Sequence, residues 1–122
     1  MTKYLTKEQI LAAPDLKVVD VDVPEWGGIV RVSQITAAAR CTLTTLIRDK
    51  DGKVLPTAEL NRMVTIGLCA LAIVDDQGNQ LFTEKDIEAL GKKSAPALDR
   101  VFNIADDLNG VTSTVSEKLR KN

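Results

Sequence analysis

Three pairs of neighbouring aspartates have the type and spacing that could support acid–base catalysis or cation binding: Asp20/Asp22, Asp75/Asp76 and Asp106/Asp107. Two adjacent carboxylates can share a proton or ligate a cation together. The first pair alternates with valines in a strand pattern, the second lies in a predicted turn, and the third lies on the polar side of a helical pattern. All three pairs are therefore expected to lie on the solvated surface and to have no catalytic or cation-binding role.

Two segments match the EF-hand calcium loop only in part. If Gly52 is the glycine of such a loop, its first and twelfth positions fall on Ile47 and Ala58, which cannot ligate calcium. If Asp75 is the first position, Gln80 stands where the glycine is required. Both segments lack essential features of the loop, so no metal is expected.

The sequence also lacks the combination of residues that nucleophilic catalysis needs, a nucleophile together with a histidine base. It contains no histidine, which excludes Ser-His-Asp and Cys-His arrangements and metal sites that need imidazole. Cys41 and Cys69 each lie in an apolar segment without a CxxC partner, which predicts two reduced core thiols rather than a disulfide or a reactive thiol. Gly27-Gly28 does not continue into a dinucleotide or P-loop motif. We expect no catalytic residues and no cofactor, and an enzyme is the least favoured class.

Composition argues against nucleic-acid and membrane partners. The 122 residues carry 16 Lys and Arg against 17 Asp and Glu, a net charge of -1, and only 3% are aromatic. This chain therefore lacks the basic excess and the stacking platforms of a nucleic-acid binder. Its longest apolar run, residues 63–74, is shorter than the roughly 20 residues that cross a bilayer. The N-terminus has no apolar core of a signal peptide.

Partner binding is the remaining kind of site, and its candidates are Trp26, Val115 and Leu119. Trp26 is predicted at a hairpin tip, where it is either an exposed binding anchor or a lid over a small core. Val115 and Leu119 lie in residues 111–122, a polar segment that we expect to be a flexible tail or to be ordered by a partner. Residues 1–110 are expected to form a single domain.

Strand patterns surround Trp26. Residues 17–23 and 29–33 alternate apolar and polar positions, and residues 24–28 between them have the length and glycines of a hairpin loop. A two-stranded hairpin is marginal alone in water, so helices must cover its valine face.

Apolar spacing predicts five helices, at residues 7–13, 37–48, 57–74, 83–92 and 95–109. Their expected capping residues are Thr6, which forms a capping box with Gln9, and Thr36, Thr57, Thr83 and Ser94. The third becomes almost wholly apolar from Met63 to Val74 and is expected to be the buried central helix, with Gly67 and Ala70 allowing a close neighbour. The predicted fold class is α+β and mostly α-helical, with an N-terminal β-hairpin packed on a small helical bundle.

Three strings in order along the chain carry a resemblance to a known family. They are DVPEWGGIVRV at residues 22–32, VDDQGNQLFT at 74–83 and ALDRVF at 97–102. Their collinear combination, from about Leu5 to Gly110, resembles the tail assembly chaperones of long-tailed phages. The resemblance implies a protein that binds the tape measure protein, keeps it soluble and helps to recruit tail tube subunits. It also implies action in the host cytoplasm, absence from the mature virion and possible homo-oligomers.

Two alternatives remain open at the level of sequence. One is a structural tail completion or connector subunit of the virion, and the other is a small regulator or antitoxin-like protein, against which the charge balance argues. The family resemblance further implies a longer product made by ribosomal frameshifting. Arg120-Lys121-Asn122 permits a slippery run of adenines in the gene, and a polar tail could lead into an extension.

Overall fold

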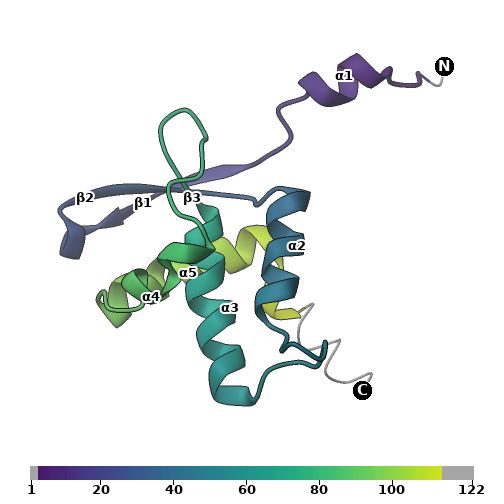
Figure 1. Cartoon of the computed structure of the whole chain (residues 1–122). Coiled ribbons are helices and arrows are strands. Elements are labelled where there is room, and N and C mark those ends of the chain that lie inside the picture. Colours follow the sequence, from purple (N-terminus) through teal and green to yellow (C-terminus); the bar gives the residue numbers. More distant parts are fainter. Residues whose placement is uncertain (1–2, 114–122) are drawn as a thin grey trace.

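The sheet and the helices occupy separate layers. In the computed structural model, which describes residues 3–113, a three-stranded antiparallel sheet in the order β1-β2-β3 lies across one end of a group of helices (Figure 1). This arrangement confirms the predicted α+β, mostly helical fold with a hairpin packed on a small bundle.

The predicted hairpin is present. β1 (Val18–Val23) pairs antiparallel with β2 (Gly28–Ser33), with Val21 opposite Val30 and Val23 opposite Gly28. The connection is a 3-10 turn, η1 (Pro24–Trp26), which ends at Gly27 with a φ of 75°. That angle favours glycine because it has no Cβ.

Helices cover the valine face of this hairpin, as expected. Val21, Val23 and Val32 are buried, and both long strands contact the C-terminal helix α5 (Ala95–Asn109). Val19, at the start of the same face, remains 38% exposed, so the cover does not extend over the whole hairpin.

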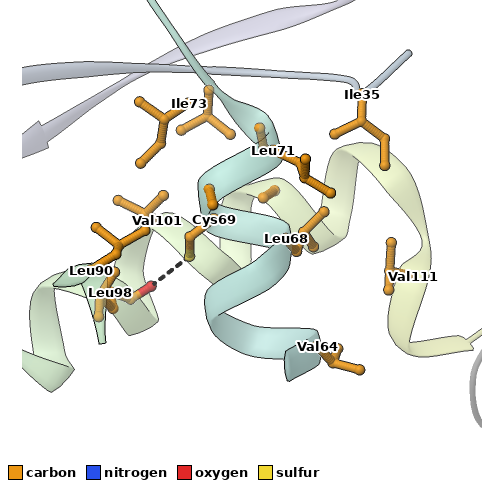
Figure 2. Packing of buried hydrophobic residues seen from close by; sticks show 14 of the residues in the cluster. Ile35, Val64, Leu68, Cys69, Leu71, Ile73, Leu90, Leu98, Val101 and Val111 are labelled. Carbon is orange, nitrogen blue, oxygen red and sulfur yellow. Dashed lines mark hydrogen bonds between the residues drawn. The ribbon is translucent and has the colours of Figure 1, made fainter. Parts of the chain in front are cut away.

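The predicted central helix is α3 (Thr57–Ala72), and it is flanked by α2 (Ala37–Leu46) and α5. Leu68, Cys69 and Ala70 are fully buried in it (Figure 2). The close approach predicted at Gly67 is confirmed, because a Cβ there would lie 3.3 Å from Cδ1 of Leu43 in α2. Thr57 was the predicted cap of this helix, but Pro56 holds the N-cap position and Thr57 is the first helical residue.

The end of the central helix differs from the prediction. Residues 73–74 were expected to be helical, but α3 stops at Ala72 and Ile73–Val74 form a short strand, β3. Ile73 pairs with Val32 and Val74 with Arg31 of β2. Both residues are β-branched and fit a pleated strand, and pairing with β2 satisfies backbone groups that would otherwise be exposed at a sheet edge.

The C-terminal half begins with a short helical segment, η2 (Glu84–Asp86) followed by α4 (Ile87–Leu90), in place of one helix over 83–92. α5 has the predicted bounds, with the Ser94 hydroxyl capping its start and Gly110 at φ 64° ending it. Val111 lies beyond the domain boundary predicted at Gly110, yet it is only 6% exposed and belongs to the core. The packed unit therefore extends at least to Val111.

The first helix, α1 (Lys7–Ala12), lies away from the rest of the protein (Figure 1). Its predicted capping box is present, since the Thr6 hydroxyl accepts from Gln9 N at 3.2 Å and Gln9 Oε1 accepts from Thr6 N at 2.9 Å. None of its residues is buried.

Candidate partner-binding surface

The tip of the hairpin is fixed to the helical layer by one ion pair. Arg100 of α5 donates two hydrogen bonds to the two carboxylate oxygens of Glu25 in η1, at 2.8 and 3.0 Å. These bonds lower the pKa of the Glu25 carboxyl from its ordinary value. Bidentate geometry of this kind restrains orientation as well as distance. The adjacent residue, Trp26, is therefore held in place over the helices.

Trp26 is half-buried and packs against the core, so the structure places it as a lid at the hairpin tip. Its indole Nε1 is buried, and among the described residues it has no hydrogen-bond partner. A buried donor without an acceptor costs free energy. Its role in binding a partner stays a prediction. Val115 and Leu119, the other two candidates, lie outside the described residues.

Two adjoining cavities meet at Trp26 and Phe82, and we call them together the Trp26–Phe82 groove. The first has a volume of about 380 Å³ and is bounded by the sheet and the turn at 75–79, with Ile29 and Leu81 on its wall. The second has a volume of about 290 Å³ and reaches α4, with Ala89 and Leu90 on its wall. Ile29 is 71% and Leu81 55% exposed. An open apolar groove with exposed large side chains is typical of protein-binding surfaces.

Negative charge predominates around the first cavity. Asp20, Asp75 and Asp76 contribute to its lining, with Arg31 as the basic residue there. Arg31 Nε donates to Asp20 at 3.1 Å, and its guanidinium also donates to the carbonyl oxygen of Asp76 at 3.1 Å. One of the three carboxylates is thus paired, and the rim keeps an acidic excess.

The partial EF-hand matches have a structural explanation. In the turn at 75–79, the Asp75 carboxylate accepts hydrogen bonds from the backbone N–H groups of Gln77 and Asn79 at 2.8 and 2.9 Å. Those bonds lower the pKa of Asp75 from its ordinary value. Asp49 accepts from Asp51 N and Lys53 N in the same way. Both carboxylates stabilise local turns. Within residues 3–113 no three His, Cys, Asp or Glu residues lie together as a potential metal site.

The prediction for the cysteines is half wrong. Cys69 is fully buried, its thiol approaches the carbonyl oxygen of Leu98 at 3.7 Å, and burial raises its pKa to about 12 (Figure 2). Cys41 is a free thiol too but is exposed, not in the core. The buried positions of α2 are Ala39 and Leu43, and Cys41 falls on the opposite side of the helix because successive residues turn by about 100°.

Phe82 and Arg100 are the residues of this surface that sequence reasoning missed. Phe82 precedes the capping residue Thr83, and Ile87 stands five positions after it, which is the spacing of a hydrophobic staple. That signal could have identified Phe82. No local signal identifies Arg100, because its partner Glu25 lies 75 residues away.

Comparison with known proteins assigns the chain to a family. A family model described as phage tail assembly chaperone matches residues 8–121. A search of curated proteins finds no match.

The solved structure of the bacteriophage HK97 tail assembly chaperone is similar in fold. The TM-score is 0.60 and the sequence identity 19%, with 83% of this chain and 94% of that chain covered. In residues 3–113 no helix has the length and hydropathy to cross a membrane. The family model covers nearly the whole chain, and the sequence strings at 22–32, 74–83 and 97–102 fall within it. This chain therefore belongs to the phage tail assembly chaperone family.

Proposed function

We propose that this protein binds the tape measure protein during tail assembly, keeps it soluble and helps to recruit tail tube subunits. The observation that carries the proposal is the family match over residues 8–121. Family membership implies interaction with tail proteins, and the Trp26–Phe82 groove supplies an apolar surface of the kind that such contacts use. The protein acts by binding and not as an enzyme. It acts in the host cytoplasm and is absent from the mature virion.

Coexpression tests this proposal. The tape measure protein of the same phage, expressed alone, is expected to be largely insoluble, and coexpression with this protein should move it into the soluble fraction and allow both to be copurified. The control is coexpression with an unrelated small soluble protein. No gain in solubility and no copurification, together with the presence of this protein in purified mature particles by mass spectrometry, would instead identify a structural tail subunit.

The proposal includes a longer, frameshifted product. Residues 120–122 lie outside the described part, so the expectation depends on the gene alone. We expect an arginine codon ending in A, then AAA, then AAC or AAT, and an open overlapping reading frame beyond them. An AAG codon for Lys121 without an overlapping frame would contradict this prediction.

A further inference from the structure

The Trp26–Phe82 groove combines exposed apolar side chains with a lining that is already packed. Ile29 is 71% and Leu81 55% exposed on its wall, whereas Ile73 on the same wall is 2% exposed. Trp26 and Phe82 line both parts of the groove and are half-buried. A partner segment can therefore bury the exposed side chains and rest on residues that the core holds in place.

Two sets of contacts hold the walls of the groove. On one side, the two hydrogen bonds from Arg100 to Glu25 fix the hairpin tip. On the other side lies the loop after β3, which stands out from the sheet in Figure 1 and is closed by hydrogen bonds to the Asp75 carboxylate. Leu81 N, at the end of this loop, donates to the carbonyl oxygen of Ile73 at 3.1 Å. A surface that is formed before binding loses less conformational entropy when a partner docks.

Unpaired negative charge surrounds the apolar wall. The charged residues of the lining are Asp20, Asp75, Asp76, Asp86, Arg31 and Lys93. Within residues 3–113 one of the four carboxylates, Asp20, is paired with Arg31. In the same part of the chain the other three have no basic partner, and the remaining cation of the lining is Lys93. An apolar groove with an acidic excess favours segments in which Lys or Arg flanks large apolar side chains.

The dimensions of the groove suit a short segment. Its two parts have volumes of about 380 and 290 Å³, close to the lower end of the range of about 300–1,000 Å³ that is usual for ligand pockets. Such a surface accepts a few large side chains at a time. A protein that must be kept soluble exposes side chains of this kind, and in the proposed function that protein is the tape measure protein.

We propose that the Trp26–Phe82 groove binds short segments of the tape measure protein in which Lys or Arg flanks large apolar side chains. The apolar side chains pack against Trp26, Ile29 and Leu81, and the basic side chains lie at the acidic rim, which includes Asp76. The identity of the partner rests on the proposed function, whereas the chemistry of the bound segment follows from the groove alone.

Tryptophan fluorescence tests both the site and the chemistry of the bound segment. The single tryptophan of the chain lies where the two parts of the groove meet. Short overlapping peptides that cover the tape measure protein, with any tryptophan replaced by phenylalanine, are titrated into the protein. Peptides in which Lys or Arg adjoins large apolar residues should shift the Trp26 emission to shorter wavelength, because the groove loses water. Replacement of their Lys and Arg by Gln should weaken binding.

Three results of this titration would overturn the proposal. The first is that no tape measure peptide shifts the Trp26 emission. The second is that the peptides that do so are indifferent to the loss of their basic residues. The third is that peptides of the tail tube protein, titrated in the same way, shift the emission and tape measure peptides do not.

Leu81→Asp tests the apolar wall. It should weaken the binding of a responding peptide by about tenfold or more, because a buried leucine is lost from the contact. Leu16→Asp is the control, since Leu16 is 44% exposed and lies outside the groove. Both positions are exposed, so the fold should be retained, which circular dichroism and thermal unfolding verify. Equal affinity of the two variants for the peptide would refute the role of the apolar wall.

Asp76→Asn tests the acidic rim. It should weaken binding by about two- to fivefold at low salt, because a charge at a solvated rim contributes modestly. Asp107→Asn makes the same change in net charge at an exposed position of α5 outside the groove and should leave binding unchanged. At about 1 M salt, where the Debye length is about 3 Å, Asp76→Asn and the wild type should bind equally. An equal loss in both variants would contradict a specific role of the rim.

Coexpression with the tape measure protein separates this inference from the proposed function. The wild type and Leu16→Asp should keep the tape measure protein soluble, and Leu81→Asp should leave more of it insoluble. If Leu81→Asp performs as the wild type does and no peptide shifts the Trp26 emission, the groove is refuted and the proposed function stands. If the wild type itself fails, the proposed function fails and the peptide titrations still decide the groove. Silent peptides together with a lower mass of Leu81→Asp in sedimentation equilibrium would assign the groove to a second copy and overturn the proposal.

Discussion

Replacement of Leu68 by Ala is expected to lower the free energy of unfolding by about 2–5 kcal/mol. Leu68 is fully buried in the middle of α3 (Figure 2), a helix that packs against both α2 and α5. Loss of its isobutyl group removes buried apolar area and leaves a cavity that tightly packed neighbours fill only in part. Urea unfolding followed by circular dichroism measures the change as a lower midpoint at an unchanged slope.

Leu11→Ala is the matched control for Leu68→Ala. The side chain of Leu11 is 75% exposed, so its truncation should change the free energy of unfolding by less than about 0.5 kcal/mol. Low protein concentration keeps any contribution from self-association out of the comparison. If Leu68→Ala lowers the free energy of unfolding by no more than Leu11→Ala does, the central helix is not packed as described.

Asn109→Ala is expected to lower the free energy of unfolding by about 1–3 kcal/mol, because it leaves the backbone N–H of Ile35 without its hydrogen-bond acceptor. Asn109, at the end of α5, accepts a hydrogen bond at Oδ1 from Ile35 N at 2.9 Å. Its Nδ2 donates to the carbonyl oxygens of Ala105 at 2.8 Å and of Ser33 at 3.5 Å. One half-buried side chain thereby joins the last helix to the segment between β2 and α2.

Asn103→Ala is the control for this site, since Asn103 is an exposed asparagine of the same helix and its truncation should be nearly neutral. Asn109→Asp should be destabilising as well, because a carboxylate cannot donate to the two carbonyl groups and is unfavourable at a helix C-terminus. Hydrogen exchange at the Ile35 amide should quicken in both Asn109 variants. Exchange at the wild-type rate would show that Asn109 does not protect this amide.

The surface proposed for binding was only partly predictable. Trp26 is marked by its residue type and by its place in a short glycine-containing loop, and the structure keeps it at the hairpin tip. The groove beside it exists because the turn at 75–79, Phe82 and α4 meet the sheet there. No periodicity in the sequence indicates that these segments, which follow Trp26 by 49 to 64 residues, lie next to it in the fold.

Local signals alone determined most of the elements. The capping residues Thr6, Thr36, Thr83 and Ser94 act on backbone groups within three residues, and each stands where its helical segment begins in the structure. Strand alternation and the glycine at Gly27 likewise act over short range and predicted the hairpin. Such interactions depend on neighbours in sequence, so the sequence by itself carries them.

Only the tertiary structure decided where those elements meet. Ile73–Val74 leave the helical pattern because β2 offers an edge to pair with, and Val111 is buried because the end of α5 packs on the core. Cys41 is exposed because the core lies on the other side of α2. The pairs Glu25–Arg100 and Ile35–Asn109 join residues more than 70 positions apart. Each of these outcomes depends on how segments far apart in the sequence pack together. Local helix and strand propensities do not determine that packing, and tertiary contacts override them.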